Sequence, residues 1–252
     1  MNAHAHDIWS EEVGPVDAPL VALIHGSMDR SSGMLKLSRH LDARARVLRY
    51  DRRGYGRSAP HDGPFAIDDQ VADLVGLLDG RRAVLVGHSY GGDVALALAQ
   101  RHPHLVASVA VYETPLSWEP WWPGTTAGGR AVAWMHDPAS AAERFMRRLV
   151  GDQRWDALPQ RTRDTRRMEG AALVGELSDL GQSAPWDPDQ IHHQVIAGFG
   201  SRGAAHHRRG MEQVAATIAM ASVVELPECR HDAPLSNPVL FASLLVDPLL
   251  AH

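Results

Sequence analysis

Short apolar runs alternate along the chain with longer segments whose apolar residues recur at helical spacing. Buried strands of a parallel sheet give the first pattern, and helices packed on that sheet give the second. The apolar runs predict strands at residues 20–24, 46–50, 83–86, 106–112, 194–197 and 222–226. Helices are expected at about 29–41, 68–78, 93–102, 207–220 and 237–249. The order of these elements predicts an α/β protein with a mostly parallel sheet.

The alternation stops between residues 115 and 188. This segment contains six of the seven tryptophans and several helical patches, but no strand pattern. We interpret it as a helical cap, residues 115–188, inserted into a core formed by residues 1–114 and 189–252. An apolar cap over a core lines a pocket, for which Trp118, Trp122 and Trp134 are candidates.

The composition is that of a globular protein with one core. The 252 residues are 44% hydrophobic and 22% charged, and the net charge of −5 does not favour nucleic acid as a partner. Cys229 is the single cysteine, so neither a disulfide framework nor a cysteine-rich metal site is expected. The N-terminus does not resemble a signal peptide, and no stretch is long enough to span a membrane. We therefore expect a cytoplasmic protein with a small-molecule substrate, either monomeric or homodimeric.

A serine motif follows the third apolar run directly. Residues 87–92 read Gly-His-Ser-Tyr-Gly-Gly and lead into a helix-forming segment. In a tight turn from strand to helix, glycines allow close packing and the serine hydroxyl is held clear of the backbone. The N–H groups after the serine then lie at the positive end of the helix. This context predicts Ser89 as a nucleophile.

These motifs resemble those of the α/β-hydrolase superfamily. The resemblance covers essentially the whole chain and includes His25-Gly26, the glycine-rich turn at 51–58, the Ser89 motif and Arg230-His231. It implies an eight-stranded, mostly parallel sheet flanked by helices, with a cap over the carboxyl ends of the strands. The chain looks closest to the small capped serine-esterase branch, which uses no cofactor. The same resemblance implies His231 as the catalytic base.

The acid that would orient His231 is not at its usual place. Most members of the family carry an aspartate in the loop after the strand at 194–197, but residues 198–205 contain no carboxylate. Either the triad is incomplete, or the acid has moved to the end of the preceding strand, a variant known in the superfamily. Glu113 occupies that place, where it can hold a histidine in the required tautomer. The alternative is that Glu113 is only a hinge residue at the cap boundary.

An oxyanion hole requires two backbone N–H groups aimed at the developing negative charge. By motif position, Tyr90 provides one of them. Ser27, which follows His25-Gly26, provides the other, with Met28 as the second choice.

Histidine pairs elsewhere do not suggest a metal site. His192-His193 and His206-His207 have no carboxylate or cysteine beside them at ligand spacing. We interpret both pairs as solvated surface and expect no metal.

The arginines between Arg144 and Arg167 are interleaved with carboxylates. They suggest either a solvated, charge-laced helix face or a site for an anionic substrate, such as a CoA thioester or a carboxylate. The interleaving favours the solvated face.

Two functions remain open. The first is a serine hydrolase that cleaves an apolar carboxylic ester, a thioester or a lactone through an acyl-enzyme on Ser89. The second is a non-hydrolytic member of the superfamily, either a ligand-binding protein or a cofactor-independent lyase or oxygenase.

Overall fold

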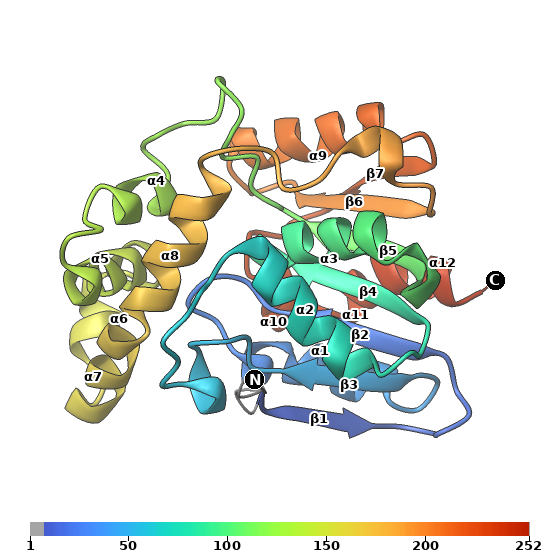
Figure 1. The fold of residues 1–252 in the computed structure, drawn as a ribbon, viewed down its shortest axis with the longest axis horizontal. Helices are drawn as coiled ribbons and strands as arrows, with labels where there is room; N and C mark the ends of the chain where they lie inside the picture. Colours follow the sequence, from blue (N-terminus) through green and yellow to red (C-terminus); the bar gives the residue numbers. More distant parts are fainter. Residues whose placement is uncertain (1–7, 252) are drawn as a thin grey trace, which may run out of the picture.

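A twisted sheet of seven strands runs through the centre of the computed structural model, which describes residues 8–251 (Figure 1). The strand order is β1-β3-β2-β4-β5-β6-β7, and only β1 is antiparallel to its neighbour. The strands are β1 (Ser10–Val13), β2 (Leu20–Ile24), β3 (Arg46–Tyr50), β4 (Ala83–His88), β5 (Val106–Tyr112), β6 (Val195–Gly200) and β7 (Ala221–Leu226). The α/β fold class expected from the sequence is confirmed, with seven strands in the described residues instead of eight.

Strand β1 is the element that the hydrophobic pattern missed. Its sequence, Ser-Glu-Glu-Val, lies at the edge of the sheet and carries no fully buried side chain. Short, charged edge strands are common because they discourage pairing with other chains, but they lack an apolar pattern. The strands at the centre behave oppositely, since β2, β4 and β6 are buried along their whole length.

Helices cover both faces of the sheet, which explains the continuous apolar runs. One face packs against α2 (Ile67–Leu78), α3 (Tyr90–Arg101) and α9 (Ala205–Thr217). The other packs against α1 (Leu35–Leu41) and the C-terminal elements α10 (Ala233–Ser236), α11 (Pro238–Phe241), η5 (Ala242–Val246) and α12 (Asp247–Leu250). Single turns occur at η1 (Ser31–Met34), η2 (Gly56–Ser58), η3 (Pro103–Leu105) and η4 (Pro188–Gln190).

The C-terminal helix predicted at 237–249 is interrupted. A π-helical turn, η5, separates α11 from α12. Pro248 follows this turn, and a proline has no backbone N–H to continue the α-helical hydrogen bonds. The apolar residues still face the sheet, because Phe241, Leu245 and Leu249 are buried.

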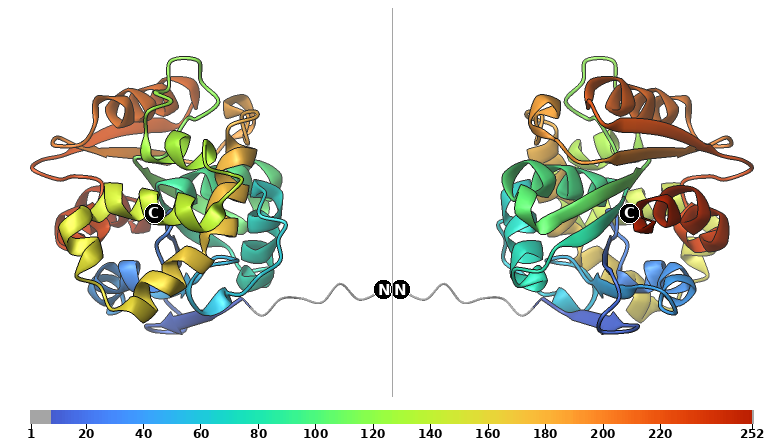
Figure 2. Two further views of the ribbon diagram at one scale, coloured as in Figure 1. Left: turned by 90° about the vertical axis from the view of Figure 1, so that its left-hand side faces the viewer. Right: turned by 90° about the vertical axis from the view of Figure 1, so that its right-hand side faces the viewer.

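Residues 115–188, here called the helical segment, contain no strand. Their helices are α4 (Ala127–Val132), α5 (Pro138–Val150), α6 (Asp152–Asp156), α7 (Gln160–Met168) and α8 (Gly170–Leu180). Figures 1 and 2 show these helices beyond the ends toward which the parallel strands point. In open α/β sheets, that edge is where ligands bind.

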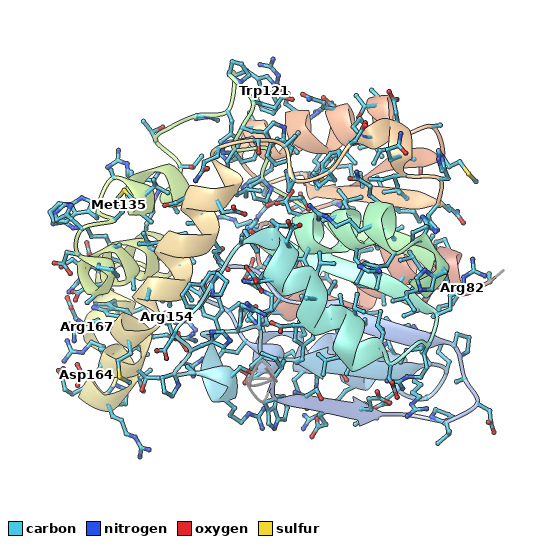
Figure 3. All side chains as sticks on the ribbon, in the orientation of Figure 1. Arg82, Trp121, Met135, Arg154, Asp164 and Arg167 are labelled. Atoms are coloured by element: carbon cyan, nitrogen blue, oxygen red, sulfur yellow. The ribbon has the colours of Figure 1, made fainter. Side chains whose placement is uncertain are left out.

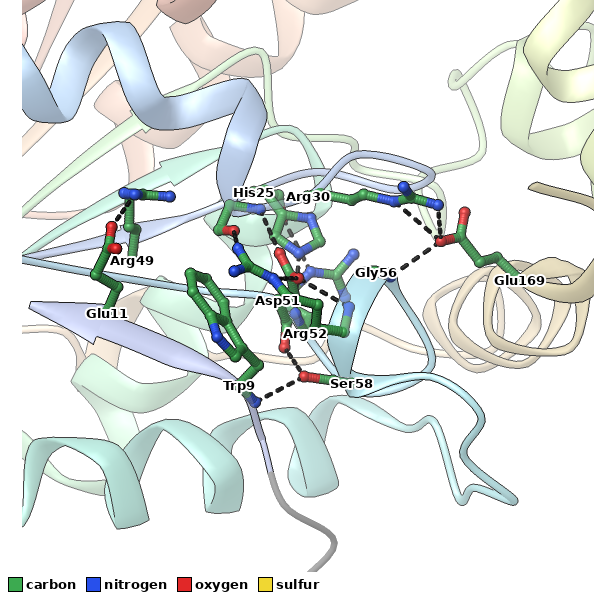
Figure 4. Close-up of polar contacts among 12 residues, drawn as sticks. Trp9, Glu11, His25, Arg30, Arg49, Asp51, Arg52, Gly56, Ser58 and Glu169 are labelled. Atoms are coloured by element: carbon green, nitrogen blue, oxygen red, sulfur yellow. Dashed lines mark hydrogen bonds and ion pairs between the residues drawn. The ribbon is translucent and has the colours of Figure 1, made fainter. Parts of the chain in front are cut away.

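Buried polar contacts tie the helical segment to the loop after β3. Arg52 donates to Glu176 of α8 at 2.7 Å, and the Tyr55 hydroxyl donates to the same carboxylate at 2.7 Å. Glu169 accepts hydrogen bonds from Arg30 at 2.5 Å and from the Gly56 N–H at 2.9 Å (Figure 4). These contacts bring α8 next to the loops that follow β2 and β3.

The Arg52–Glu176 pair is expected to be sensitive to substitution, because both side chains are fully buried. Glu176→Gln leaves the Arg52 guanidinium without its counter-charge and should lower the free energy of unfolding by about 3–5 kcal/mol. Urea denaturation measures the loss. Asp164→Asn is the control, because Asp164 pairs with Arg167 at the surface, and it should cost under about 1 kcal/mol. Equal stability of the two variants would contradict the prediction.

Candidate active site

Ser89 lies in a strained turn between β4 and α3. Its φ of 53° and ψ of −129° place a non-glycine residue in a region that L-amino acids rarely adopt. The turn is tight, because a Cβ atom at Gly91 would lie 2.2 Å from the carbonyl oxygen of Ile24. Ser89 is partly exposed, whereas its neighbours His88 and Tyr90 are buried. The turn therefore presents the serine at the carboxyl end of the central strand.

Glu113 and His231 meet at the same edge of the sheet. Glu113 directly follows β5, and its Oε2 accepts a hydrogen bond from Nδ1 of His231 at 2.7 Å. Its Oε1 accepts the Gly200 N–H at 3.0 Å. A Cβ atom at Gly203 would lie 2.4 Å from this Oε1, so the loop after β6 needs a glycine there. The carboxylate-free loop thus wraps around a carboxylate supplied by the neighbouring strand.

The environment of Glu113 favours its charged form. Burial by itself would raise the pKa of this carboxyl, since its side chain is fully buried. The His231 hydrogen bond, the nearby His207 and the Gly200 N–H act in the opposite direction and hold the pKa below its usual value. With Nδ1 of His231 donating to the carboxylate, the lone pair of the neutral ring is on Nε2.

Two side chains from the strands hold the loop that carries His231. His88 Nε2 donates to the His231 carbonyl oxygen at 2.7 Å, and the Tyr112 hydroxyl donates to the Arg230 carbonyl oxygen at 2.8 Å. The His88 and His231 ring centroids are 4.6 Å apart. Burial and the nearby His231 lower the pKa of His88 to about 3, so His88 acts as a neutral donor. Because His88 precedes Ser89, these contacts place His231 beside the serine turn.

The interpretation of His206-His207 as solvated surface is wrong for His207. Only 17% of this side chain is exposed, and its ring stacks on His231 with centroids 4.8 Å apart and planes 19° apart. Nε2 of His207 is 3.9 Å from Glu113 Oε2. Burial and the nearby His231 lower the pKa of His207 to about 3. No sequence pattern links α9 to residue 231, so this contact could not be predicted from the sequence.

Glu113, His207 and His231 offer possible metal-ligand atoms within 4.8 Å of one another. The ring geometry does not suit a metal. A histidine binds an ion along its lone pair, which lies in the plane of the ring. Two rings stacked nearly parallel direct their lone pairs along separate planes, and Nδ1 of His231 already donates to Glu113. The cluster is better suited to proton transfer than to chelation.

The loop after β2 passes directly over the serine. A Cβ atom at Gly26 would lie 2.9 Å from Cβ of Ser89. His25 fixes this loop, because its Nδ1 donates to the Gly26 carbonyl at 2.8 Å and its Nε2 accepts the Arg52 N–H at 2.9 Å (Figure 4). Ser27 and Met28, the two candidates for one oxyanion donor, follow in this loop.

The two candidates in this loop differ in exposure and in backbone conformation. Ser27 is partly exposed, whereas Met28 is buried and has a φ of 56°. Arg166 of α7 donates to the Met28 carbonyl at 3.0 Å, which fixes the peptide group after Met28, whereas the Met28 N–H belongs to the preceding one. The other candidate donor, Tyr90, is the first residue of α3.

The three tryptophans expected in a substrate pocket lie in different surroundings. Trp118 packs edge-on against Trp186, with centroids 5.6 Å apart. Trp122 contacts His206 at 4.8 Å and therefore lies next to the histidine cluster. Trp134 lines a separate cavity between α4 and α5. Within residues 8–251, no ring contact joins the three.

The model of the Alpha/beta hydrolase family matches residues 21–244 of the chain. The chain belongs to this family. The match includes the Ser89 turn, Glu113 and His231, and it confirms the family expected from the motifs.

Curated relatives of the chain are hydrolases. Rhodomycin D methylesterase DauP from a Streptomyces species is 26% identical, and the match covers 89% of this chain and 82% of that protein. Lipase LipV from Mycobacterium tuberculosis is 34% identical over 42% of this chain and 41% of its own length. The putative carbamate hydrolase RutD from Variovorax paradoxus is 41% identical over 39% of each. The last two matches thus span about two fifths of those relatives.

Solved structures of similar proteins show the same fold. A hydrolase from Pseudomonas aeruginosa superposes with a TM-score of 0.77 at 23% identity, and the match covers 100% of both chains. The enol-lactonase from Burkholderia xenovorans gives a TM-score of 0.72 at 24% identity, covering 97% of this chain and 96% of that one. Within residues 8–251, no helix is long and apolar enough to cross a bilayer.

Proposed function

We propose that the protein is a serine hydrolase that cleaves a carboxylic ester, a thioester or a lactone through an acyl-enzyme on Ser89. The observation that carries this proposal is the 2.7 Å hydrogen bond between His231 and the buried Glu113, next to the strained serine turn. A base oriented by a carboxylate beside a serine is the arrangement that activates a hydroxyl nucleophile. The methylesterase relative, similar over most of both chains, supports the same chemistry.

In the proposed reaction, Nε2 of His231 accepts the proton of the Ser89 hydroxyl while Oγ attacks the substrate carbonyl carbon. The resulting imidazolium is stabilised by the Glu113 carboxylate, and it returns the proton to the leaving group when the ester bond breaks. A water molecule then repeats the sequence on the acyl-enzyme, with His231 again as the base. The products are a carboxylic acid and free Ser89.

We assign the oxyanion hole to the backbone N–H groups of Tyr90 and Ser27, with Met28 as the alternative to Ser27. Tyr90 begins α3, so its N–H lies at the positive end of a helix. Ser27 lies in the loop that contacts Ser89 through Gly26. Removing one such donor typically costs about 3 kcal/mol of transition-state stabilisation. We further propose that the helical segment acts as the cap over this site.

The carboxylate-free loop at 198–205 is the feature that favours a non-hydrolytic protein, because it suggests an incomplete triad. That loop now has another explanation, since Gly200 and Gly203 accommodate and bind the Glu113 carboxylate. A complete set of nucleophile, base and acid therefore favours turnover over binding alone.

A fluorophosphonate probe tests the nucleophile without knowledge of the substrate. We expect the native protein to gain one covalent adduct, found by mass spectrometry on the peptide that contains Ser89, because an activated serine attacks phosphorus as it attacks a carbonyl. Ser89→Ala should remain unlabelled. Ser201→Ala, which changes an exposed serine in the loop after β6, is the matched control and should label normally. An unlabelled native protein would rule out the proposed function.

A further inference from the structure

A cavity of about 330 Å³ lies between α4 and α5 of the helical segment, and its lining is strongly cationic. Arg130 of α4 and Arg144, Arg147 and Arg148 of α5 contribute to the lining, together with Trp134 and Phe145. No carboxylate lines it. Such a concentration of positive charge is notable in a chain whose net charge is −5.

The structure divides the arginines of the helical segment into two groups. Arg147 and Arg167 are neutralised, because both bind Glu143 and each also binds a nearby aspartate. Arg167 and its partner Asp164 lie at the outer edge of the helical segment (Figure 3). Arg166 likewise pairs with Glu169. Arg147 and Arg167 match the solvated, charge-laced face that the interleaved sequence predicts, whereas Arg166 is largely buried and bonded to Met28 and Glu169.

The second group consists of Arg130, Arg144 and Arg148. Within residues 8–251, none of them forms an ion pair or a hydrogen bond with a carboxylate. Asp137, a partly exposed helix cap that accepts the Ser140 N–H, interacts electrostatically with Arg144 but does not pair with it. Arg144 and Arg148 are four residues apart on one helix face, a spacing at which like charges repel. A bound anion would relieve this repulsion.

Trp134 gives the cavity an ordered wall. The Arg144 guanidinium lies 3.8 Å from the centre of the Trp134 ring, and His136 stacks on the same tryptophan at 5.6 Å. A guanidinium positioned over an aromatic face can still use its N–H groups to bind a planar oxyanion. The buried Phe145 adds apolar surface for the body of a ligand.

The helical segment that carries the cavity also contacts the histidines at the candidate active site, because Trp122 packs on His206 with ring centroids 4.8 Å apart. Burial is the largest cause that lowers the pKa of His206, and the positive charge of Arg148 contributes in the same direction. His206 packs on His207, with centroids 4.3 Å apart, and His207 stacks on His231. The helical segment thus contacts, through Trp122, the cluster that surrounds the proposed base, and Arg148 contributes to the electrostatics of His206.

We propose that this cavity binds an oxyanion, either a carboxylate or a phosphate, carried by an apolar ligand. Resting on the proposed function, the corollary is that the hydrolase prefers esters or lactones that bear a negative charge away from the scissile bond. Arg144 and Arg148 hold the anion, Arg130 adds to the field, and Phe145 contacts the apolar body. An apolar ester or lactone is expected from the sequence, and this proposal adds one negatively charged group to that substrate.

Calorimetric titration tests the binding step alone. The probes are benzoate and phenyl phosphate, with benzamide as the uncharged comparison, all at one ionic strength. We expect the native protein to bind at least one of the two anions and not benzamide, and the tighter anion identifies the oxyanion. Arg144→Gln/Arg148→Gln should weaken that binding at least tenfold. Arg161→Gln, an exposed arginine outside the cavity, is the matched control.

Two results would overturn the proposal: anions that bind no better than benzamide, or anion binding that survives in the double variant. The single variant Arg144→Gln serves if thermal unfolding shows that the double variant is not folded. These titrations involve no turnover, so they test the anion site even if the protein is not a hydrolase.

Kinetics test the corollary about substrates. The ratio of kcat/KM for 4-acetoxybenzoate to that for phenyl acetate should fall at least tenfold in the double variant, mainly through KM. Comparing the same ratio in two proteins cancels the intrinsic reactivity of the esters. An unchanged ratio would reject the substrate preference. If neither ester is cleaved and Ser89 is not labelled, the proposed function fails, while the calorimetric result still decides the anion site.

Discussion

Ser89→Ala should lower kcat for phenyl acetate hydrolysis by about a millionfold, the loss typical of removing the nucleophile of a serine triad. Without the Ser89 hydroxyl, His231 has no proton to accept and the acyl-enzyme cannot form. The backbone donors and the pocket remain, so a residual acceleration of about 10³–10⁴ over the uncatalysed reaction should persist. Steady-state kinetics on protein purified in parallel with the native enzyme measure the difference.

Stability separates loss of chemistry from loss of structure in this variant. Alanine keeps the Cβ atom, so the strained φ of 53° at position 89 is retained and the thermal midpoint should change little. The Ser89 N–H bond to the Tyr112 carbonyl, at 2.9 Å, is also unaffected. Activity above a tenth of the native value, in a folded variant free of contaminating esterase, would exclude Ser89 as the nucleophile.

The sequence predicts this fold well where burial is continuous. Strands such as β2 and β4 are apolar over their whole length because both faces of a parallel sheet are covered. The hydrophobic pattern does not predict an element that is stabilised by interactions other than burial. The edge strand β1 exists through hydrogen bonds to β3, and its residues Ser10, Glu11 and Glu12 leave no apolar signal.

The same distinction applies to the candidate site. Ser89, Glu113 and the loop after β6 could be predicted together because they follow adjacent parallel strands, whose carboxyl ends meet at one edge. His207 could not, since its position depends on how α9 packs against the loop that carries His231. Likewise, Arg147 and Arg148 are neighbours in the sequence. Only the folded structure shows that Arg147 pairs with Glu143 and Asp156, whereas Arg148 lines the cavity without such a partner within residues 8–251.

Glu113→Gln should lower kcat by about 10³–10⁴-fold while the KM for phenyl acetate changes little. The native carboxylate accepts two hydrogen bonds, from Gly200 N–H through one oxygen and from His231 Nδ1–H through the other. Glutamine has a single oxygen and can satisfy only one of these donors. If that oxygen faces Gly200, the amide NH₂ faces Nδ1 of His231 and forces the ring proton onto Nε2, where it prevents acceptance of the serine proton.

In the opposite orientation of the Glu113→Gln amide, His231 keeps its tautomer. The negative charge that stabilises the imidazolium is nevertheless lost, and the Gly200 N–H faces an NH₂ group in a buried site. Because the environment holds the Glu113 pKa below its usual value, the native enzyme carries this charge throughout the neutral range. Both orientations of the amide therefore predict slow turnover in a folded protein.

Asp232→Asn is the matched control for Glu113→Gln, because Asp232 is the exposed carboxylate adjacent to His231 in the chain. We expect it to retain nearly native kcat, and thermal unfolding should show that both variants are folded. A Glu113→Gln enzyme within tenfold of native turnover would remove Glu113 from the mechanism. A large loss in Asp232→Asn alone would transfer the role of the acid to Asp232. The predicted contrast arises because only Glu113 reaches Nδ1 of His231 from a fully buried position, where no solvent can replace its charge.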